Sequence, residues 1–232
     1  NINTSGSSWN TAAVTNMSYM FRGATAFNGN ISSWNTALVT DMNNMFRDAS
    51  AFNQDITSWN TTIVTDMSSM FYGATAFNKD INTSGSSWNT ASVTNMGYMF
   101  KDATAFNGNI SSWNTAAVLS FWNMFGGATV FNQNIGSWNT AAVRSMNYMF
   151  YDAEDFDKNI SSWNTSSVTK MDHMFKYAEA FNQDISSWDT AAVTTMEEMF
   201  NGAAAFNQPL THNGNSWNLA NVTNMTNMFN GA

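Results

Sequence analysis

Apolar and polar residues recur along this chain with a period of about 25 residues. Successive marker tryptophans are 25 residues apart, apart from two intervals of 29, and they are Trp9, Trp34, Trp59, Trp88, Trp113, Trp138, Trp163, Trp188 and Trp217. With tryptophan as position 1, the consensus is W-N-T-A-x-V-T-x-M-x-x-M-F-x-x-A-x-x-F-N-x-x-I-x-S. We call one copy a rung. This strict period predicts a single repeat solenoid over residues 1–232, not two domains.

Each rung predicts a short helix followed by a short strand. Positions 9, 12, 13 and 16 have the i, i+3, i+4, i+7 spacing of an amphipathic helix, as in Met17, Met20, Phe21 and Ala24. Threonine at position 7 is a suitable N-cap, and glycine at position 15 marks the helix exit. The run 31–34 is the expected strand, which would pair in parallel with its copies. The expected fold class is an α/β solenoid with strands on one face and helices on the other.

The large apolar residues are almost completely assigned to this pattern. All 17 methionines lie at positions 9 and 12, and 17 of the 18 phenylalanines lie at positions 13 and 19. Nine of the ten tryptophans lie at position 1. These columns therefore predict the core. Asparagine recurs at position 20, as in Asn28 and Asn53, and we expect it to bond the backbone of the neighbouring rung.

The departures from the repeat are the candidate binding residues. Four extra residues precede Trp88, and four more precede Trp217. Insertions in solenoids loop out on one face, which is often used for binding. Trp122 takes a helix-surface position in the irregular fifth rung, where it either contacts a partner or packs on a neighbouring helix. The candidates are Asn82, Thr83, Ser84, Gly85, Trp122, Thr211, His212, Asn213 and Gly214.

Composition excludes several classes of function. The net charge is −8 and the eight Lys and Arg residues are scattered, which argues against nucleic-acid binding. The absence of cysteine excludes disulfides and thiolate chemistry. No apolar run reaches the ~18–20 residues of a membrane span. The chain starts in mid-pattern at Asn1, and we expect it to be a fragment of a longer protein.

Catalytic and metal chemistry receive little support from the residues. His173 and His212 belong to no recurring His/Asp/Ser set, so we expect no enzyme and no cofactor. No metal site is predicted, and the alternative Ca²⁺ candidates are Asp155 and Asp157. The row of threonines at position 3, from Thr11 to Thr190, raises ice binding as a further alternative.

The motif V-T-x-M-x-x-M-F-x-x-A-x-x-F-N-x-D-I resembles the BspA-like leucine-rich repeat family of bacterial and mycoplasma surface lipoproteins. It occurs almost whole over residues 64–81, and the resemblance covers essentially the entire chain. Many relatives carry cysteine at position 16, where this chain has alanine. The resemblance implies a leucine-rich-repeat-like, right-handed coil, an extracellular or cell-surface location and a role in adhesion or protein binding. It carries over no catalytic residues.

The expected function is therefore a non-enzymatic, secreted or cell-surface repeat module that binds protein or glycan. The alternative is a structural stalk or a self-assembling subunit of an extracellular filament. In that case homo-oligomers would form through uncapped solenoid ends, because an end rung without a polar cap exposes core residues.

Overall fold

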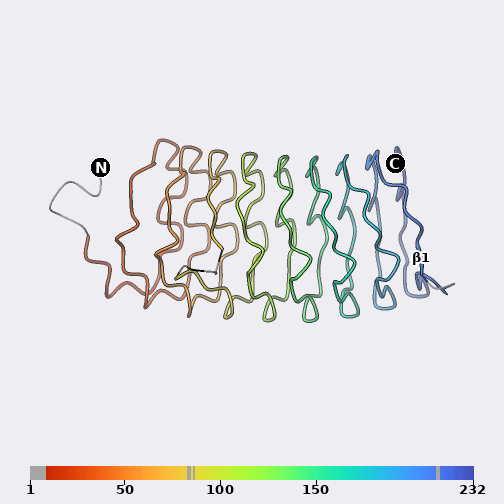
Figure 1. The fold of residues 1–232 in the computed structure, drawn as a ribbon, viewed down its shortest axis with the longest axis horizontal. Helices are drawn as coiled ribbons and strands as arrows, with labels where there is room; N and C mark the ends of the chain where they lie inside the picture. The colour runs from red at the N-terminus through yellow and green to blue at the C-terminus, as the bar shows by residue number, and fades with distance from the viewer. Residues whose placement is uncertain (1–8, 83–84, 86, 213–214) are drawn as a thin grey trace.

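The chain coils into a stack of rungs, one for each repeat. A computed structural model describes residues 9–82, 85, 87–212 and 215–232. Successive rungs lie side by side along the long axis of the molecule (Figure 1). Isolated parallel β-bridges join position 8 of each rung to position 8 of the next, from Asn16↔Asp41 to Thr195↔Asn224. The 25-residue period is thus the distance along the chain from one rung to the same place in the following rung.

Regular secondary structure is scarce in the described residues. The only strands there are β1 (Thr211–His212) and β2 (Asn215–Ser216), which pair antiparallel in the second insertion. No helix occurs in the described part of the chain. The rungs are built mainly from turns joined by hydrogen bonds between neighbouring copies.

The helix expected over the Met/Phe stripe is wrong for the described rungs. In the second rung, Met45, Arg47 and Ala49 donate their N–H groups to carbonyls three residues earlier, at 3.2, 3.2 and 3.0 Å. The residues between them donate to the next rung, with Phe46 N–H bonding Met70 O at 2.9 Å and Asp48 N–H bonding Tyr72 O at 2.7 Å. The segment is therefore a series of turns whose remaining N–H groups connect the rungs.

The backbone angles explain why no helix forms there. Positions 11 and 15 adopt positive φ in every described rung, for example +54° at Asn44 and +58° at Asp48. A right-handed helix needs negative φ at each residue. The i, i+3, i+4, i+7 spacing is also satisfied by repeated turns with a left-handed residue every fourth position. Glycine at position 15, which we interpreted as a helix exit, is one of these left-handed residues.

The strand expected at residues 31–34 is also wrong, because this run forms a turn. Trp34 donates its backbone N–H to Ile31 O at 3.1 Å, and Ser32 donates its backbone N–H to Asn30 Oδ1 at 2.9 Å. Parallel pairing occurs instead at position 8, just before the Met/Phe segment. Serine, asparagine and aspartate in this run favour such turns because their side chains bond the nearby backbone.

Stacked aromatic rings fill the core, as the sequence predicts. Phe71 lies 5.7 Å from Phe46 and 5.5 Å from Phe100 between ring centroids, with interplanar angles of 7° and 5°. Within a rung, the position 13 and 19 rings are closer, at 4.0 Å for Phe71 and Phe77. The tryptophans form a third stack, with Trp34 and Trp59 6.3 Å apart. Each of these rings therefore stacks on its own copies in the neighbouring rungs, and the position 13 ring also packs closely on the position 19 ring of its own rung.

Polar side chains form a second kind of connection between rungs. Trp59 donates its indole N–H to Ile31 O at 3.1 Å. Asn28 Oδ1 accepts the backbone N–H of Asn53 at 2.9 Å, and the same contact continues along position 20 to Asn207. This confirms the expected asparagine ladder.

The threonine row at position 3 is buried. Thr61 and Thr90 are 0% exposed, and Thr36 donates its hydroxyl to Asn60 O at 2.9 Å. The row therefore serves the backbone of neighbouring rungs. It cannot present hydroxyls to an ice surface, so the ice-binding alternative loses the feature on which it rested.

Candidate functional site

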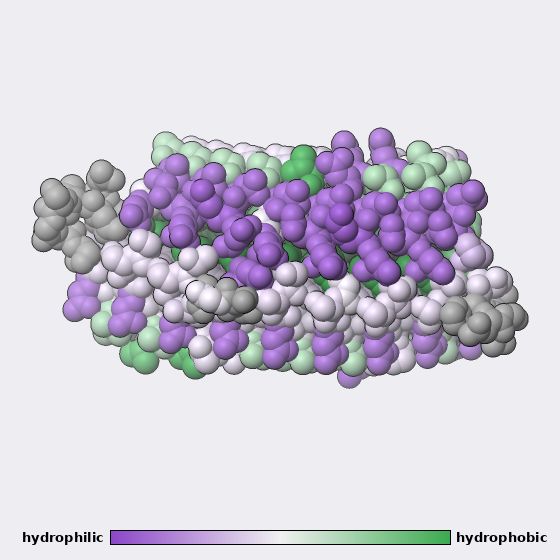
Figure 2. Space-filling model, viewed as in Figure 1, coloured by the Kyte–Doolittle hydropathy of each residue, from purple (hydrophilic) through white to green (hydrophobic). Residues whose placement is uncertain are grey.

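Four repeat positions, 10, 11, 14 and 15, alternate in pairs with the buried positions 9, 12, 13 and 16. We call these four columns the surface band. The band contains all six tyrosines, Trp122, His173 and four of the eight Lys and Arg residues of the chain. Hydrophilic rows run along the stack on the face shown in Figure 2. The band is thus a chemically varied strip attached to a uniform core.

The local backbone decides which residues fit the band. Positions 11 and 15 are left-handed, a conformation that glycine adopts freely and that asparagine and aspartate tolerate better than most residues. Accordingly, position 15 contains glycine in five rungs and aspartate in three. Position 11 is more varied and includes Tyr98 at φ +59° and His173 at φ +57°. These side chains are held in strained local backbone by the hydrogen bonds between rungs.

At position 15, the side chain of one rung can occupy the space beside the glycine of the next rung. A Cβ atom on Gly73 would lie 2.6 Å from Asp48 Oδ1, and one on Gly127 would lie 2.4 Å from Asp102 Oδ1. A carboxylate in one rung therefore leans over a glycine in the next rung. Glycine is required at these two places both for its positive φ and for the missing side chain.

The aromatic part of the band spans the third to fifth rungs. Tyr98 lies 6.4 Å from Tyr72 and 4.8 Å from Trp122 between ring centroids, with interplanar angles of 42° and 53°. Arg47 lies over the Tyr72 ring at 4.4 Å, and Lys101 lies over it at 5.1 Å. These contacts hold cationic and aromatic groups together at the surface, where both are useful for recognition.

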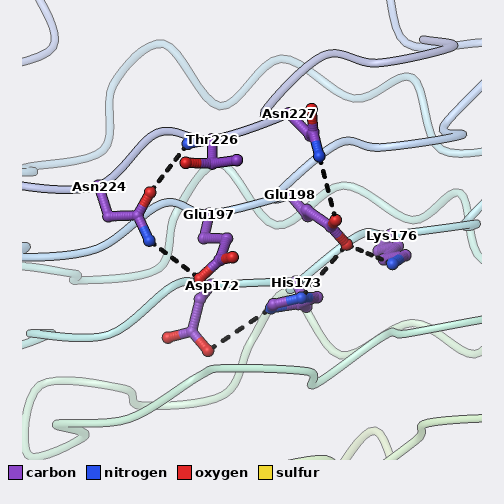
Figure 3. A network of polar contacts seen from close by, with 8 residues as sticks. All are labelled: Asp172, His173, Lys176, Glu197, Glu198, Asn224, Thr226 and Asn227. Atoms are coloured by element: carbon purple, nitrogen blue, oxygen red, sulfur yellow. Dashed lines mark hydrogen bonds and ion pairs between the residues drawn. The ribbon is translucent and has the colours of Figure 1, made fainter.

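The ionic part of the band lies in the seventh and eighth rungs (Figure 3). His173 Nε2 is 3.3 Å from Glu198 Oε2, and His173 Nδ1 is 3.7 Å from Asp172 Oδ2. The imidazole stacks on Tyr148 at 4.3 Å with an interplanar angle of 6°. Lys176 donates a hydrogen bond to Glu198 and thereby lowers the pKa of that carboxyl. Oppositely charged side chains of the seventh and eighth rungs are thus paired at the surface.

The same network continues into the ninth rung (Figure 3). Asn224 donates its side-chain N–H to Glu197 Oε2 at 2.9 Å, and Asn227 donates to Glu198 Oε1 at 3.4 Å. Burial raises the pKa of the Tyr148 hydroxyl, and the negative charges of Asp172 and Glu197 raise it further. This end of the band therefore has a predominantly acidic environment.

Charge is unevenly distributed along the stack. Residues 138–216 contain ten acidic and four basic residues, a formal net charge of −6, whereas residues 1–137 contain six and four, a net charge of −2. The later rungs therefore attract a cationic partner more strongly than the earlier ones.

Trp122 combines the two interpretations that the sequence left open. Its side chain is 43% exposed, so the indole can reach a partner. It also packs against Tyr98 of the neighbouring rung, although not on a helix. The backbone carbonyl of Trp122 accepts the Tyr98 N–H at 2.8 Å. The indole of Trp122 is thus exposed, while its backbone is hydrogen-bonded to the neighbouring rung.

The first insertion is only partly described. Asn82 Oδ1 accepts the backbone N–H of Ser112 at 2.8 Å, which ties the insertion to the following rung. Gly85 is exposed and has φ +77°. Thr83 and Ser84 lie outside the described residues. Beside this insertion is a hollow of about 520 Å³ lined mainly by polar side chains.

The second insertion forms the β1–β2 hairpin instead of an irregular loop. Thr211 is exposed, and the backbone of His212 pairs with that of Asn215. Asn213 and Gly214 lie outside the described residues. The contacts that are described do not bring this insertion together with Trp122.

Asp157, one of the two Ca²⁺ candidates, has a structural role. Asp157 occupies position 20, and its Oδ1 accepts the Asn182 backbone N–H at 2.9 Å and the Gln183 side-chain N–H at 2.7 Å. Asp155 donates its backbone N–H to Thr129 O at 2.9 Å. No group of three or more His, Asp or Glu residues able to hold a metal occurs in the described part of the chain. Asp157 is therefore a member of the asparagine ladder.

The sequence interpretation missed the surface band as a unit. Methionine, phenylalanine and tryptophan define the core columns, whereas the tyrosines at position 11 (Tyr19, Tyr98 and Tyr148) indicate only a surface or half-buried residue of the expected helix. The signal was present, because all six tyrosines fall in only three columns, at positions 11, 14 and 15. The assumed helix concealed it, since a helix places these positions on a solvated face of no particular interest.

Comparison with known proteins identifies the family. The family model described as "Mycoplasma protein of unknown function, DUF285" matches residues 1–85, 81–168 and 133–232. No curated protein matches the chain. The described residues include no helix long and apolar enough to cross a membrane. Because the three matches together span all 232 residues, the chain belongs to the DUF285 repeat family.

Proposed function

We propose that this chain is a non-enzymatic binding module of a secreted or cell-surface bacterial protein, and that it contacts protein or glycan through the surface band. The observation that carries this proposal is the contrast between columns. Core columns keep one residue type from rung to rung, whereas the band varies and collects tyrosine, tryptophan, histidine and charge. Exposed aromatic and basic side chains are characteristic of binding hot spots.

The resemblance to BspA-like leucine-rich repeats supports an extracellular location and an adhesive role. It also supports assigning the stack to the leucine-rich-repeat-like, right-handed solenoids, although here with turns in place of helices. The His173 cluster fits a binding module, since its imidazole lies between two carboxylates and stacks on a tyrosine. Such an arrangement balances charge on a surface that another molecule can cover.

The test uses the chain on glycan arrays and on intact bacterial and host cells, beside two variants. Tyr98→Ala/Trp122→Ala removes two of the three rings in the aromatic part of the band and leaves Tyr72. Leu38→Ala is the matched control, because Leu38 is 52% exposed and lies at position 5, outside the band. We expect binding by the chain and the control, and a loss of about tenfold or more in the double variant. Equal binding by all three proteins, or binding by none, would overturn the proposal.

A further inference from the structure

The fifth rung is where the surface band loses its side chains. Positions 14 and 15 are Gly126 and Gly127, whereas the fourth rung has Lys101 and Asp102 there. The sixth rung has Tyr151 and Asp152 in the same columns. Two adjacent glycines therefore separate two rungs that each carry a large side chain and a carboxylate.

Oxygen atoms from other residues occupy the space above these glycines. Asn123 Oδ1 lies 1.8 Å from the place where a Cβ atom on Gly126 would be, and Asp102 Oδ1 lies 2.4 Å from that of Gly127. Asn123 is 8% exposed, and its Oδ1 has no hydrogen-bond partner among the described residues. A buried acceptor without a donor destabilises the folded chain, and a donor that reached it would remove that cost. The site therefore contains an unsatisfied acceptor next to a carboxylate whose side chain is 44% exposed.

Negative charge and aromatic rings border these oxygens. Burial raises the pKa of the Asp152 carboxyl, and the negative charge of Asp102 raises it further, while Lys101 opposes this effect. Lys101 Nζ bonds Asp102 Oδ2 at 2.6 Å, which leaves Oδ1 as the atom above Gly127. Trp122, packed on Tyr98 and 43% exposed, provides a ring beside the same rung.

We propose that the fifth rung binds an arginine side chain of a protein partner. The proposal rests on the proposed function and names the partner class and the site. A guanidinium has five N–H donors in one plane and stacks well on an indole. It can therefore pair with the carboxylates of Asp102 and Asp152 while it lies against Trp122. Asn123 Oδ1 is a further acceptor that the guanidinium would reach only by displacing the atoms that now cover it. Lysine supplies neither the planar fork nor the stacking, and a neutral sugar supplies no charge for the two carboxylates.

The charge of the later rungs extends this argument to the partner's flanking residues. Residues 138–216 have a formal net charge of −6. A segment with its arginine at the fifth rung and further basic residues toward the sixth to eighth rungs would be attracted along the band. The partner surface is accordingly basic and rich in arginine.

The test measures binding of a fluorescein-labelled nonapeptide of alternating arginine and serine by fluorescence anisotropy. The comparison peptide replaces each arginine with lysine. The variants are Asp152→Asn and Trp122→Ala, and the matched control is Asp55→Asn, which changes net charge equally. Asp55 lies at position 22, outside the band, where other rungs carry asparagine such as Asn30. Melting temperatures of all variants show that each one is folded.

We expect the arginine peptide to bind about tenfold more tightly than the lysine peptide, and each site variant to weaken it about tenfold. Asp55→Asn should leave binding unchanged. Equal binding of both peptides, or an equal loss in Asp55→Asn and Asp152→Asn, would overturn the proposal in favour of diffuse attraction. Displacement of the peptide by uncharged maltohexaose would overturn it in favour of a glycan site. If the chain binds cells through the band but not the arginine peptide, this inference fails while the proposed function stands.

Discussion

Position 13 is phenylalanine in all nine rungs, whereas position 11, two residues earlier, is tyrosine, asparagine, serine, histidine or glutamate. Both columns belong to the same series of turns and are held by the same hydrogen bonds between rungs. They differ in what their side chains contact. A position 13 ring packs against its own copies in two neighbouring rungs, so a change in one copy affects three rungs.

A position 11 side chain needs only to tolerate a left-handed backbone, which several residue types do when their surroundings hold them. In this chain, constant core positions such as 13 therefore determine the fold, and surface positions such as 11 are free to vary. Variation beside a constant core is therefore the evidence for a binding surface here.

The largest expected effect comes from breaking a core column. Phe100→Ala removes a fully buried ring that lies 5.5 Å from Phe71, 5.7 Å from Phe125 and 3.8 Å from Phe106. We expect the free energy of unfolding to fall by about 3–5 kcal/mol. Tyr98→Ala in the neighbouring column should cost less than about 1 kcal/mol. Urea denaturation followed by circular dichroism measures both, and similar losses would contradict the division between core and band.

An intermediate effect is expected in the asparagine ladder. Asn107→Ala removes the acceptor of the Asn132 backbone N–H at 3.0 Å and of the Gln133 side-chain N–H at 2.9 Å. We expect a loss of about 1–3 kcal/mol in the free energy of unfolding. Asp157→Asn keeps an Oδ1 acceptor and should change it by no more than about 0.5 kcal/mol. A large loss in Asp157→Asn would show that this position needs its negative charge.

The smallest effect concerns charge in the surface band. Lys176 lowers the pKa of Glu198 in the folded chain below its ordinary value of 4.5. The stabilisation is therefore present above that value and is lost as the pH falls through the lower, folded-state pKa. The melting temperature of Glu198→Gln should lie slightly below that of the parent chain at neutral pH, and the gap should close in acid. In a Lys176→Met background the gap should narrow, because only the contacts of Glu198 with Asn227 and His173 remain, and an unchanged gap would contradict this account.

The period and the core could be predicted from the sequence because large side chains must be buried and their copies recur at fixed spacing. Met67, Phe71 and Phe77 are buried as expected, and Asn28 bonds the next rung as expected. The local backbone could not be predicted in the same way. A helix and a series of turns with a left-handed residue every fourth position bury the same side chains, so the apolar spacing alone does not distinguish them.

The signal that separates the two backbones lies in small polar residues. Asp48, Gly73, Asp102 and Gly127 occupy position 15 in consecutive rungs, and each prefers or tolerates positive φ. A single glycine at this position is typical of a helix end, whereas glycine and aspartate repeated in the column indicate a recurring left-handed residue. Trp122 was found because it departs from the repeat. The tyrosines were missed because they lie at regular repeat positions, 11, 14 and 15, and so do not stand out as departures.

The carboxylates that lean over glycines have a consequence for how such an array can be rearranged. Asp48 fills the space above Gly73, and Asp102 fills the space above Gly127, so at these two junctions the rung that follows the aspartate has no room for a side chain at position 15. The core would accept any permutation of rungs, because its columns are nearly identical. Placing the second rung before another rung that carries aspartate at position 15 would set two carboxylates in the same space. Recombination among these repeats should therefore keep the second rung with the third and the fourth rung with the fifth, whereas Asp152 of the sixth rung is followed by Tyr177 and needs no glycine after it.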